Sequence, residues 1–270
     1  MKATVIADSI ADGCPRLTTL QLRYPRFIHA EFMTHRVFSR NASSSRAIPV
    51  DRMIKDIIDN PAMPVSWNKE QRGMQGGDES DTCVTLTDEY GYWSNVKTNT
   101  EAWLATRDSA IMHARAFAAA GYHKQIVNRI LEPFQYINVL VTATEWDNFF
   151  ALRDHPDAQP EIQALARTMK VAMGDSEPVK LNYGEWHTPY VERNGDKRVS
   201  SACCASTSYK TVDGKPMTVE RALSVFDKLT GDPLHASPFE HIARPDPDNG
   251  GGCRNFTRWH QWRADLEGDT

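Results

Sequence analysis

The sequence predicts an α+β protein, because strand-like and helix-like patterns are segregated along the chain. Residues 16–25 alternate in the way a half-buried strand does. Segments with helical spacing then follow one another from about 98 to 173, and strand-like segments return from 181 onward. Strands at both ends with a helical region between them are typical of an α+β fold with a mixed or antiparallel sheet.

Size and composition place the chain among ordinary folded proteins. Its 270 residues are 40% hydrophobic and 24% charged, which is near average, so we expect one domain over 1–270. The formal net charge of -4 provides no basic surface for duplex nucleic acid or an anionic membrane, so any anion site must be local. Apolar runs such as INVLVTA, from Ile137, are too short to span a membrane, and the first residues lack an apolar leader. We therefore expect a cytoplasmic protein.

The cysteines and histidines give no metal-binding pattern. The five cysteines are odd in number and scattered, and the one close pair is vicinal rather than spaced for zinc. We expect reduced thiols and no metal site. The cysteines are Cys14, Cys83, Cys203, Cys204 and Cys253.

The first third of the chain predicts a strand, two helices and a long loop. The strand over 16–25 ends at Pro25. Helical spacing over 26–38 predicts a helix that places His35 on the same face as Ser39. A short helix over 50–60 stops at Pro61. The stretch 61–98 is rich in Gly, Asp and Ser, so we expect a long surface loop or lid.

The remaining elements are read from caps and periodicity. Thr144, with Asp147 three residues later, predicts an N-cap, and Thr218 and Gly231 bracket another helix. Trp259 and Trp262 are three residues apart, so we expect them to pack against the core. The predicted helices cover 99–120, 122–132, 142–153, 157–173 and 218–231; 181–191 is predicted as strand, 199–209 as strand or loop, and 235–252 as loop.

The stretch THRVFSRNASSSR, residues 34–46, is the strongest chemical signal. Ser43 to Arg46 offers hydroxyl donors, backbone N–H groups and a guanidinium, which together suit a phosphate monoester. A solvated serine loop is the alternative. His35 and Arg36 just upstream favour a binding site and indicate a second anion or an electron-rich ring beside the first.

Three motifs resemble the signature of flavin-dependent thymidylate synthases. The first is His-Arg-x-x-Ser-x-Asn-x-x-Ser-x-Arg, from His35 to Arg46. The second has the family's N-F-x-x-L-R-x-x-x-x-A-Q-x-E-I spacing from Asn148 to Ile162, preceded by Arg129 on an earlier helix. The third is SPFEH, residues 237–241, which is similar to the family's Pro-x-Glu-His segment.

The order of these motifs differs from that of typical family members. Their Glu-His segment precedes the first motif, whereas here it lies near the C-terminus, after the stretch SACCASTSY that resembles the family's N-terminal region. This order indicates a circular permutation, which a fold tolerates when the original termini are exposed and close together.

The resemblance implies a fold, an assembly and a reaction. It implies the flavin-dependent thymidylate synthase-like α+β fold, assembled as a homotetramer with active sites where subunits meet. dUMP would receive a methylene group from methylenetetrahydrofolate, and FAD reduced by NADPH would supply the hydride that completes dTMP. No cysteine adds to the base in this family.

The resemblance also implies roles for individual residues, which we expect to converge on a monophosphate and an isoalloxazine. Arg153 would face the pyrimidine carbonyls and stabilise developing negative charge, and His241 would act beside flavin and folate. The implied nucleotide ligands are Glu31, Ser44, Ser45, Arg46, Arg129 and Arg153, and the implied FAD ligands are Thr34, His35, Arg36, Asn148 and His241.

Departures from the family pattern leave alternatives open. Thr34 replaces the first arginine, Ala42 a usual glutamate and Ala47 a usual tyrosine. The alternatives are methylation or hydroxymethylation of another pyrimidine deoxynucleotide, and a nucleotide-binding relative without catalysis.

Two implied site residues have structural alternatives. Arg129 could pair with Glu132 at helical spacing. His241 could be a loop histidine that bonds the backbone.

Overall fold

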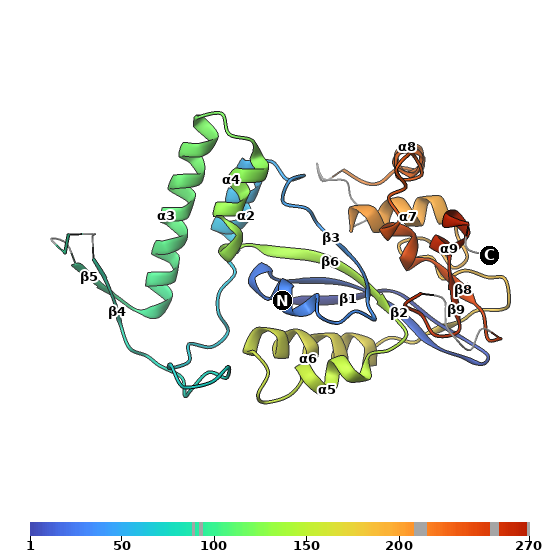
Figure 1. Ribbon diagram of the computed structural model, residues 1–270, viewed down its shortest axis with the longest axis horizontal. Helices are drawn as coiled ribbons and strands as arrows, with labels where there is room; N and C mark the ends of the chain where they lie inside the picture. Colours follow the sequence, from blue (N-terminus) through green and yellow to red (C-terminus); the bar gives the residue numbers. More distant parts are fainter. Residues whose placement is uncertain (88–89, 92–93, 208–214, 249–253, 269–270) are drawn as a thin grey trace.

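A mixed five-stranded sheet lies at the centre of the molecule (Figure 1). The computed structural model describes residues 1–87, 90–91, 94–207, 215–248 and 254–268. The strand order is β3-β6-β2-β1-β7, and every pairing is antiparallel except that of β1 with β7. The predicted α+β class with a mixed sheet is confirmed. The strands are β1 Lys2–Ala11, β2 Cys14–Pro25, β3 Ser39–Ala42, β6 Tyr136–Ala143 and β7 Val179–Lys180.

Each face of this sheet is covered by different elements. Val139 and Val141 of β6 point to the face on which α5 (Asp147–Arg153) and α6 (Pro160–Gly174) pack. Leu140 points to the other face and meets Cys203 and Cys204 of α7, Lys197–Ser206. Because successive strand residues face opposite sides, β6 is buried on both.

Three helices form a second layer beyond one end of the sheet (Figure 1). They are α2 Val50–Asp59, α3 Asn99–Ala119 and α4 Lys124–Ile130, and they share a hydrophobic cluster that includes Ile57, Ile111 and Val127. Thr98 and Glu101 form a capping box that starts α3. The three helices predicted in these stretches are confirmed, with ends shifted by a few residues.

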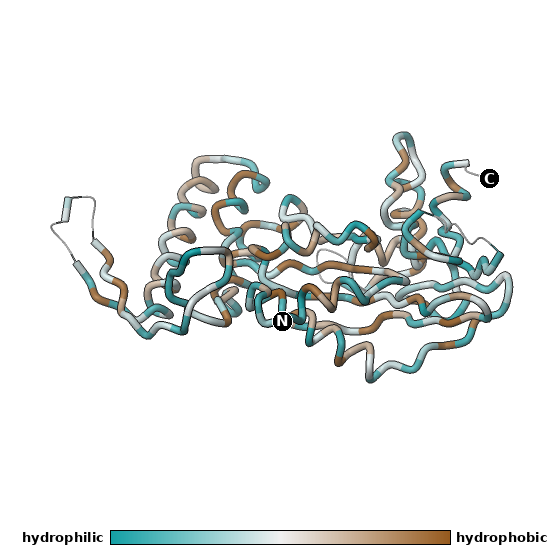
Figure 2. Tube along the Cα trace, turned by 60° about the horizontal axis from the view of Figure 1, so that its bottom comes forward, coloured by the Kyte–Doolittle hydropathy of each residue, from teal (hydrophilic) through white to brown (hydrophobic). Residues whose placement is uncertain are grey.

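The segment 61–98 contains a hairpin as well as loop. β4 (Val84–Thr87) pairs with β5 (Ser94–Lys97), and both Figures 1 and 2 show this arm standing away from the body. Val84 and Val96 are exposed on it. The alternating V-T-L-T of β4 is a strand signal that the composition of the surrounding loop obscures.

The C-terminal part packs as small elements on the α7 side of the sheet (Figure 1). The predicted helix capped by Thr218 is confirmed as α8, and Trp259 and Trp262 are buried as expected. The predicted loop over 235–252 is wrong in part, because it contains η3 and β8. The elements are α8 Val219–Leu229, η3 Ser237–His241, β8 Ala243–Pro245, β9 Trp259–Gln261 and α9 Trp262–Glu267.

The helix predicted over 26–38, next to the first motif, is wrong in its extent. Over 26–38 the chain forms only η1 (Arg26–Ile28) and α1 (His29–Phe32), and Ser39 begins β3. His35 and Ser39 therefore share no helical face, because pairing of β3 with β6 overrides the local spacing.

The helix predicted from 142 begins later. β6 runs through Ala143, and α5 starts at Asp147 with Trp146 at the N-cap. The position of Thr144 is set by the end of the buried strand, so its capping signal is not used.

Two strand predictions in the C-terminal third are also wrong. Residues 181–191 form turns with one isolated bridge, His187 to Ala243. The stretch predicted as strand or loop over 199–209 is helical through Ser206, because Asp196 caps it and its small side chains allow close packing on the sheet. Residues 208–209 of that prediction, and Cys253, lie outside the described residues.

The hydropathy of the chain follows this architecture. Figure 2 shows hydrophobic residues concentrated along the central strands and mostly hydrophilic residues in the peripheral loops. Across the described ranges, no helix combines the length and apolar character that crossing a membrane requires.

Candidate functional site

The polar stretch 34–46 serves two cavities, because β3 runs through its middle. Thr34 to Val37 precede β3 and line one cavity, whereas Ser43 to Arg46 follow it and line another. The four residues of β3 span about 13 Å at the usual strand rise. The stretch therefore places its two halves at opposite ends of a short strand.

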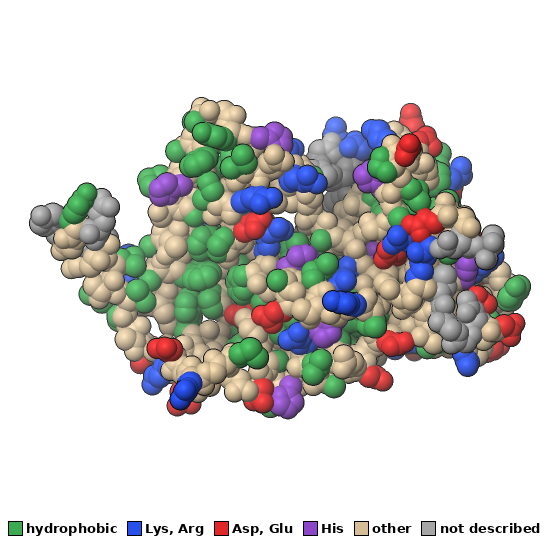
Figure 3. Space-filling view, in the orientation of Figure 1, with side chains coloured by type: hydrophobic (Ala, Val, Ile, Leu, Met, Phe, Trp, Pro, Cys, Tyr) green, Lys and Arg blue, Asp and Glu red, His purple; other side chains and the backbone are tan. Residues whose placement is uncertain are grey.

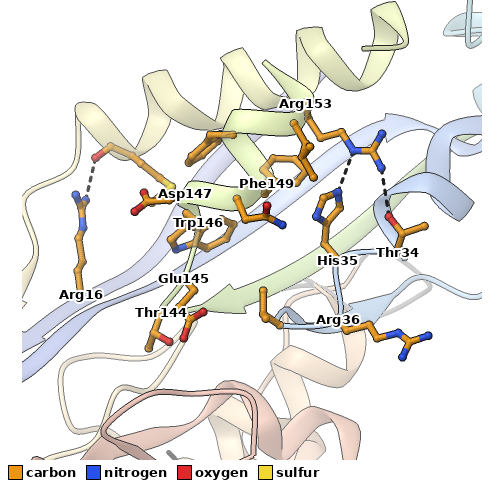
Figure 4. Close-up of a pocket in the computed structure, with 15 residues that line it drawn as sticks. Arg16, Thr34, His35, Arg36, Thr144, Glu145, Trp146, Asp147, Phe149 and Arg153 are labelled. Carbon is orange, nitrogen blue, oxygen red and sulfur yellow. Dashed lines mark hydrogen bonds between the residues drawn. The ribbon is translucent and has the colours of Figure 1, made fainter. Parts of the chain in front are cut away.

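The first of these, here called the Arg153 cavity, has a volume of about 650 Å³. It lies between the turn that precedes β3, the β6–α5 connection and α5 itself (Figure 4). The predicted residues that it brings together are Thr34, His35, Arg36, Asn148 and Arg153.

Arg153 is held by three residues of the segment 31–35. Its Nε donates to His35 Nε2 at 2.9 Å and its Nη2 donates to Thr34 Oγ1 at 3.2 Å, as Figure 4 shows. Its Nη1 lies 3.8 Å from Glu31 Oε2. Glu31 is thus an ion-pair partner of Arg153, and it does not line the cavity itself.

His35 is held neutral by its surroundings. Burial and the positive charges of Arg153 and Arg40 lower the pKa of His35 to about 4. Its ring meets Phe149 edge-on, with centroids 4.9 Å apart, and stacks on Phe38. A neutral imidazole that accepts from Arg153 at Nε2 carries its proton on Nδ1.

The remaining wall combines aromatic rings with cations. Trp146, Phe149 and Phe150 line one side. Arg36 is exposed and forms no ion pair with any residue of the described ranges. Arg16 lies at the far end of the cavity in Figure 4 and is already bound to Asp8 through two hydrogen bonds.

The second, here called the serine cavity, is smaller, at about 270 Å³. Its lining combines the Ser43–Arg46 loop with Arg129, Arg26, His29 and Glu132. Figure 3 shows basic side chains gathered on the face between α4 and the sheet. The cavity suits a group the size of a phosphate.

The charges of the serine cavity are left partly unbalanced. Arg26 Nη2 forms an ion pair with Glu132 Oε1 at 3.0 Å. The alternative pairing of Glu132 with Arg129 therefore does not form. Arg46 and Arg129 have no acidic partner in the part of the chain that the structure describes. Two guanidinium groups therefore remain for an anion.

A buried asparagine positions the serine loop. Asn128 Nδ2 donates to the carbonyls of Ser45 at 2.8 Å and Ile48 at 3.0 Å, and its side chain is fully buried. Ser43 bonds the backbone of Asn138 on β6. The loop is therefore attached to α4 and to the sheet at separate points.

His241 lies in the interior and lines neither of the two cavities. Its Nδ1 bonds Thr142 Oγ1 at 2.8 Å, and its Nε2 is buried without a partner among the described residues. Burial lowers the pKa of His241 to about 3. Its observed bond is to a side chain, so the alternative of a backbone-bonded loop histidine is not what the structure shows.

A series of hydrogen bonds between side chains runs from Thr142 across the sheet. Thr142 Oγ1 lies 2.7 Å from Thr19 Oγ1, which bonds His187 Nε2 at 2.8 Å. His187 Nδ1 in turn bonds Ser9 Oγ at 2.8 Å. Burial lowers the pKa of His187 to about 3, so both histidines of this chain are neutral.

The described cysteines do not take part in either cavity. Cys14, Cys83, Cys203 and Cys204 are free thiols, and burial raises the pKa of Cys203 to about 11. Within the described ranges, no three His, Cys, Asp or Glu side chains group as metal ligands.

Several lining residues were not predicted. They lie outside the motifs, and a signal exists for two: Asn128 adjoins Arg129 on a helix, and Trp146 lies two residues before the second motif. The unpredicted residues include Arg16, Arg26, His29, Glu145 and Trp146, which line the cavities, and Asn128, which supports the serine loop from behind.

One chain does not bring Arg46 and Arg153 into a common cavity. The expected convergence on a monophosphate and an isoalloxazine is therefore incomplete within the single chain.

Comparison with solved structures gave two structures of a UMP/dUMP methylase, PolB, from Streptomyces cacaoi. The one bound with 5-Br dUMP is 19% identical, with a TM-score of 0.43, and the match covers 59% of this chain and 66% of that chain, just under two thirds of its length. The one bound with 5-Br UMP is 16% identical, with a TM-score of 0.48, and covers 64% of this chain and 88% of that chain. A search of curated proteins found no match.

The family comparison covers both motifs that surround the Arg153 cavity. The model of the thymidylate synthase complementing protein matches residues 17–179, which is more than half of the chain. The chain therefore belongs to the thymidylate synthase complementing protein family, the flavin-dependent thymidylate synthases that its motifs resemble.

Proposed function

We propose that this protein is a flavin-dependent thymidylate synthase that converts dUMP to dTMP. Methylenetetrahydrofolate would provide the one-carbon unit and NADPH the reducing equivalents. The observation that carries the proposal is that the family match over residues 17–179 includes every lining residue of both cavities except Arg16. One of these cavities has unbalanced guanidinium groups and the other has a constrained arginine.

The serine cavity supports the nucleotide part of the proposal. A phosphate monoester carries close to two negative charges at neutral pH, and Arg46 and Arg129 offer two cations that have no acidic partner among the described residues. Ser44 and Ser45 add hydroxyl donors at the same wall. We assign these four residues to the phosphate of dUMP.

The Arg153 cavity supports the cofactor part. The aromatic wall suits a flat conjugated ring, and Arg36, which forms no ion pair within the described ranges, suits phosphates linked to that ring. A volume of about 650 Å³ falls within the usual range for a ligand pocket. His35, Arg36 and Asn148 would hold FAD there, and Thr34 lies at the same wall. When bound, the reduced flavin would supply the hydride that completes the methyl group.

Arg153 is assigned to charge stabilisation at the base. A guanidinium held in place before the reaction stabilises negative charge on a pyrimidine carbonyl without having to reorient. His241 is fully buried. It can act beside the base only after a ligand or a structural change exposes it.

Because the two cavities lie apart on one chain, the complete site requires neighbouring copies. We propose a homotetramer in which the serine cavity of one chain meets the Arg153 cavity of another. Measurement of the mass in solution by light scattering tests the assembly.

The reaction is tested by spectroscopy and turnover. The purified protein, supplied with FAD, is expected to show a flavin absorption spectrum that changes on addition of dUMP, and to form dTMP only when methylenetetrahydrofolate and NADPH are present. Parallel assays with UMP and dCMP identify the base and the sugar. A colourless protein that takes up no FAD yet binds dUMP would refute the enzyme assignment in favour of a nucleotide-binding relative.

A further inference from the structure

We propose that Thr34 is a positioning residue for Arg153, acting with His35 and Glu31 to hold the guanidinium in one orientation at the wall of the Arg153 cavity. The kinetic consequence rests on the proposed function, whereas the geometry does not.

Each nitrogen of the Arg153 side chain faces a different residue of the segment 31–35. Nε donates to His35 Nε2 at 2.9 Å, Nη2 to Thr34 Oγ1 at 3.2 Å, and Nη1 lies 3.8 Å from Glu31 Oε2. A planar group contacted at all three nitrogens can neither rotate nor tilt freely. The guanidinium has five N–H donors, and these contacts do not use all of them. At least one N–H on each terminal nitrogen remains for a ligand that presents two acceptor atoms.

The Thr34 hydroxyl is oriented so that it accepts from Arg153. Its single proton is donated to the Glu31 carbonyl at 2.7 Å, within the turn in which Thr34 N also bonds that carbonyl. Only the lone pairs of Oγ1 then remain for Nη2. A cation at this position would instead repel the guanidinium.

The other two partners are themselves anchored. His35 is packed between Phe38 and Phe149, which limits movement of its ring. Glu31 belongs to α1, which is held to the core through Phe32. The segment 31–35 thus presents its three acceptors as a rigid unit to α5, which carries Arg153.

The test compares three variants of the full-length protein. Thr34→Val removes the hydroxyl at nearly constant shape, and Thr34→Ser keeps it. Thr106→Val is the matched control, because the Thr106 hydroxyl donates to the Ala102 carbonyl within α3. Thr34→Val is expected to lower kcat about 10-fold or more, with the Kd of dUMP changed less than about 2-fold. Thr34→Ser should stay within about 3-fold of the unmodified protein. The proposal is overturned if Thr34→Val behaves as the control does, or if Thr34→Ser loses as much activity as Thr34→Val.

A second measurement does not depend on turnover. In protein labelled with ¹⁵N-arginine, the Arg153 Nε–H resonance is assigned by its absence from Arg153→Lys. It should exchange slowly with water in the unmodified protein and in Thr34→Ser, and at least about 10-fold faster in Thr34→Val, because the guanidinium is then held less firmly. Equal exchange rates in all three would overturn the positioning role even if the protein turns over no nucleotide. Absence of turnover with the expected exchange pattern would refute only the proposed function.

Discussion

At the scale of single residues, Arg153 combines low mobility with a charge that is directed at a cavity. Its partners Thr34 and His35 are neutral, and Glu31 lies at 3.8 Å, so the positive charge is only partly neutralised. Such a group can stabilise an anion that forms during a reaction.

We predict that Arg153→Ala abolishes product formation while FAD remains bound. Loss of a group that stabilises the transition state is expected to reduce kcat by about 10²-fold or more. Flavin absorbance after gel filtration measures retention of the cofactor, and a dTMP assay measures turnover. Unchanged turnover, or loss of flavin together with activity, would contradict the assigned role.

The serine cavity leads to a different kinetic prediction. The double variant Ser44→Ala, Arg46→Ala removes one hydroxyl and one unbalanced cation, so the Kd of dUMP should rise about 10- to 100-fold while saturated turnover changes little. Calorimetric titration with dUMP checks the affinity. Arg198→Ala is the control, since Arg198 is exposed and pairs with Asp196 on its own helix. An equal loss of affinity in the control variant would show that the effect is not local.

At the scale of elements, the serine loop depends on α4 for its position. Asn128 provides two hydrogen bonds to loop carbonyls from a fully buried site. Removing both bonds leaves buried acceptors without donors.

We predict that Asn128→Leu lowers the free energy of unfolding by about 2–4 kcal/mol and also weakens dUMP binding, because the loop loses its attachment. Urea denaturation and dUMP titration measure the two effects. Gln125→Leu, on the exposed side of the same helix, is the control and should leave both quantities near their original values. A stable variant with normal affinity would mean that contacts other than these position the loop.

Predictions of elements from local pattern succeeded or failed for identifiable reasons. The helix that Thr98 caps and the strand that Pro25 ends carry their signals within a few residues. The segment 26–38 has helical spacing, yet its helix ends at Phe32 and a turn leads into β3, which pairs with the edge of β6. Likewise, α7 reads as strand or loop, and its helical form depends on small side chains packing against the sheet.

At the scale of the whole molecule, buried histidines couple stability to pH. Burial lowers the pKa of His187 and His241 to about 3, compared with an ordinary value near 6.5. Between these values the unfolded chain binds more protons than the folded one, so stability is complete above about pH 6.5 and is lost as the pH falls.

We predict that the free energy of unfolding decreases from pH 6.5 to 4 by up to about 1.4 kcal/mol per pH unit for each such histidine. Urea denaturation at several pH values measures the slope. His187→Gln should reduce the slope, whereas His113→Gln, on an exposed part of α3, should not. A stability that is constant over this range would contradict neutral burial of the histidines.

The separation of the two cavities gives a prediction about assembly. At a dUMP concentration well below the raised Kd of Arg46→Ala, the variants Arg46→Ala and Arg153→Ala should each show little activity alone. Their co-expression should restore activity at this concentration if each site takes one arginine from each of two chains. Random pairing would leave about a quarter of the sites intact. Equal amounts of the two chains, checked by mass spectrometry, make this fraction measurable. No recovery in mixed oligomers would mean that both arginines act from the same chain.

Sequence alone determined the α+β class, the family and the polar residues of the first two motifs that line the two cavities, because motif spacing and helix caps depend on residues that are near one another in the chain. Tertiary structure decided how those side chains are distributed. The middle of the stretch 34–46 forms β3, which pairs with β6. Arg46 therefore lines one cavity and His35 lines the other. Strand pairing and burial depend on residues that are far apart in the sequence. The hydrogen bonds that hold Arg153 and the interior position of His241 are therefore set only when the chain is folded.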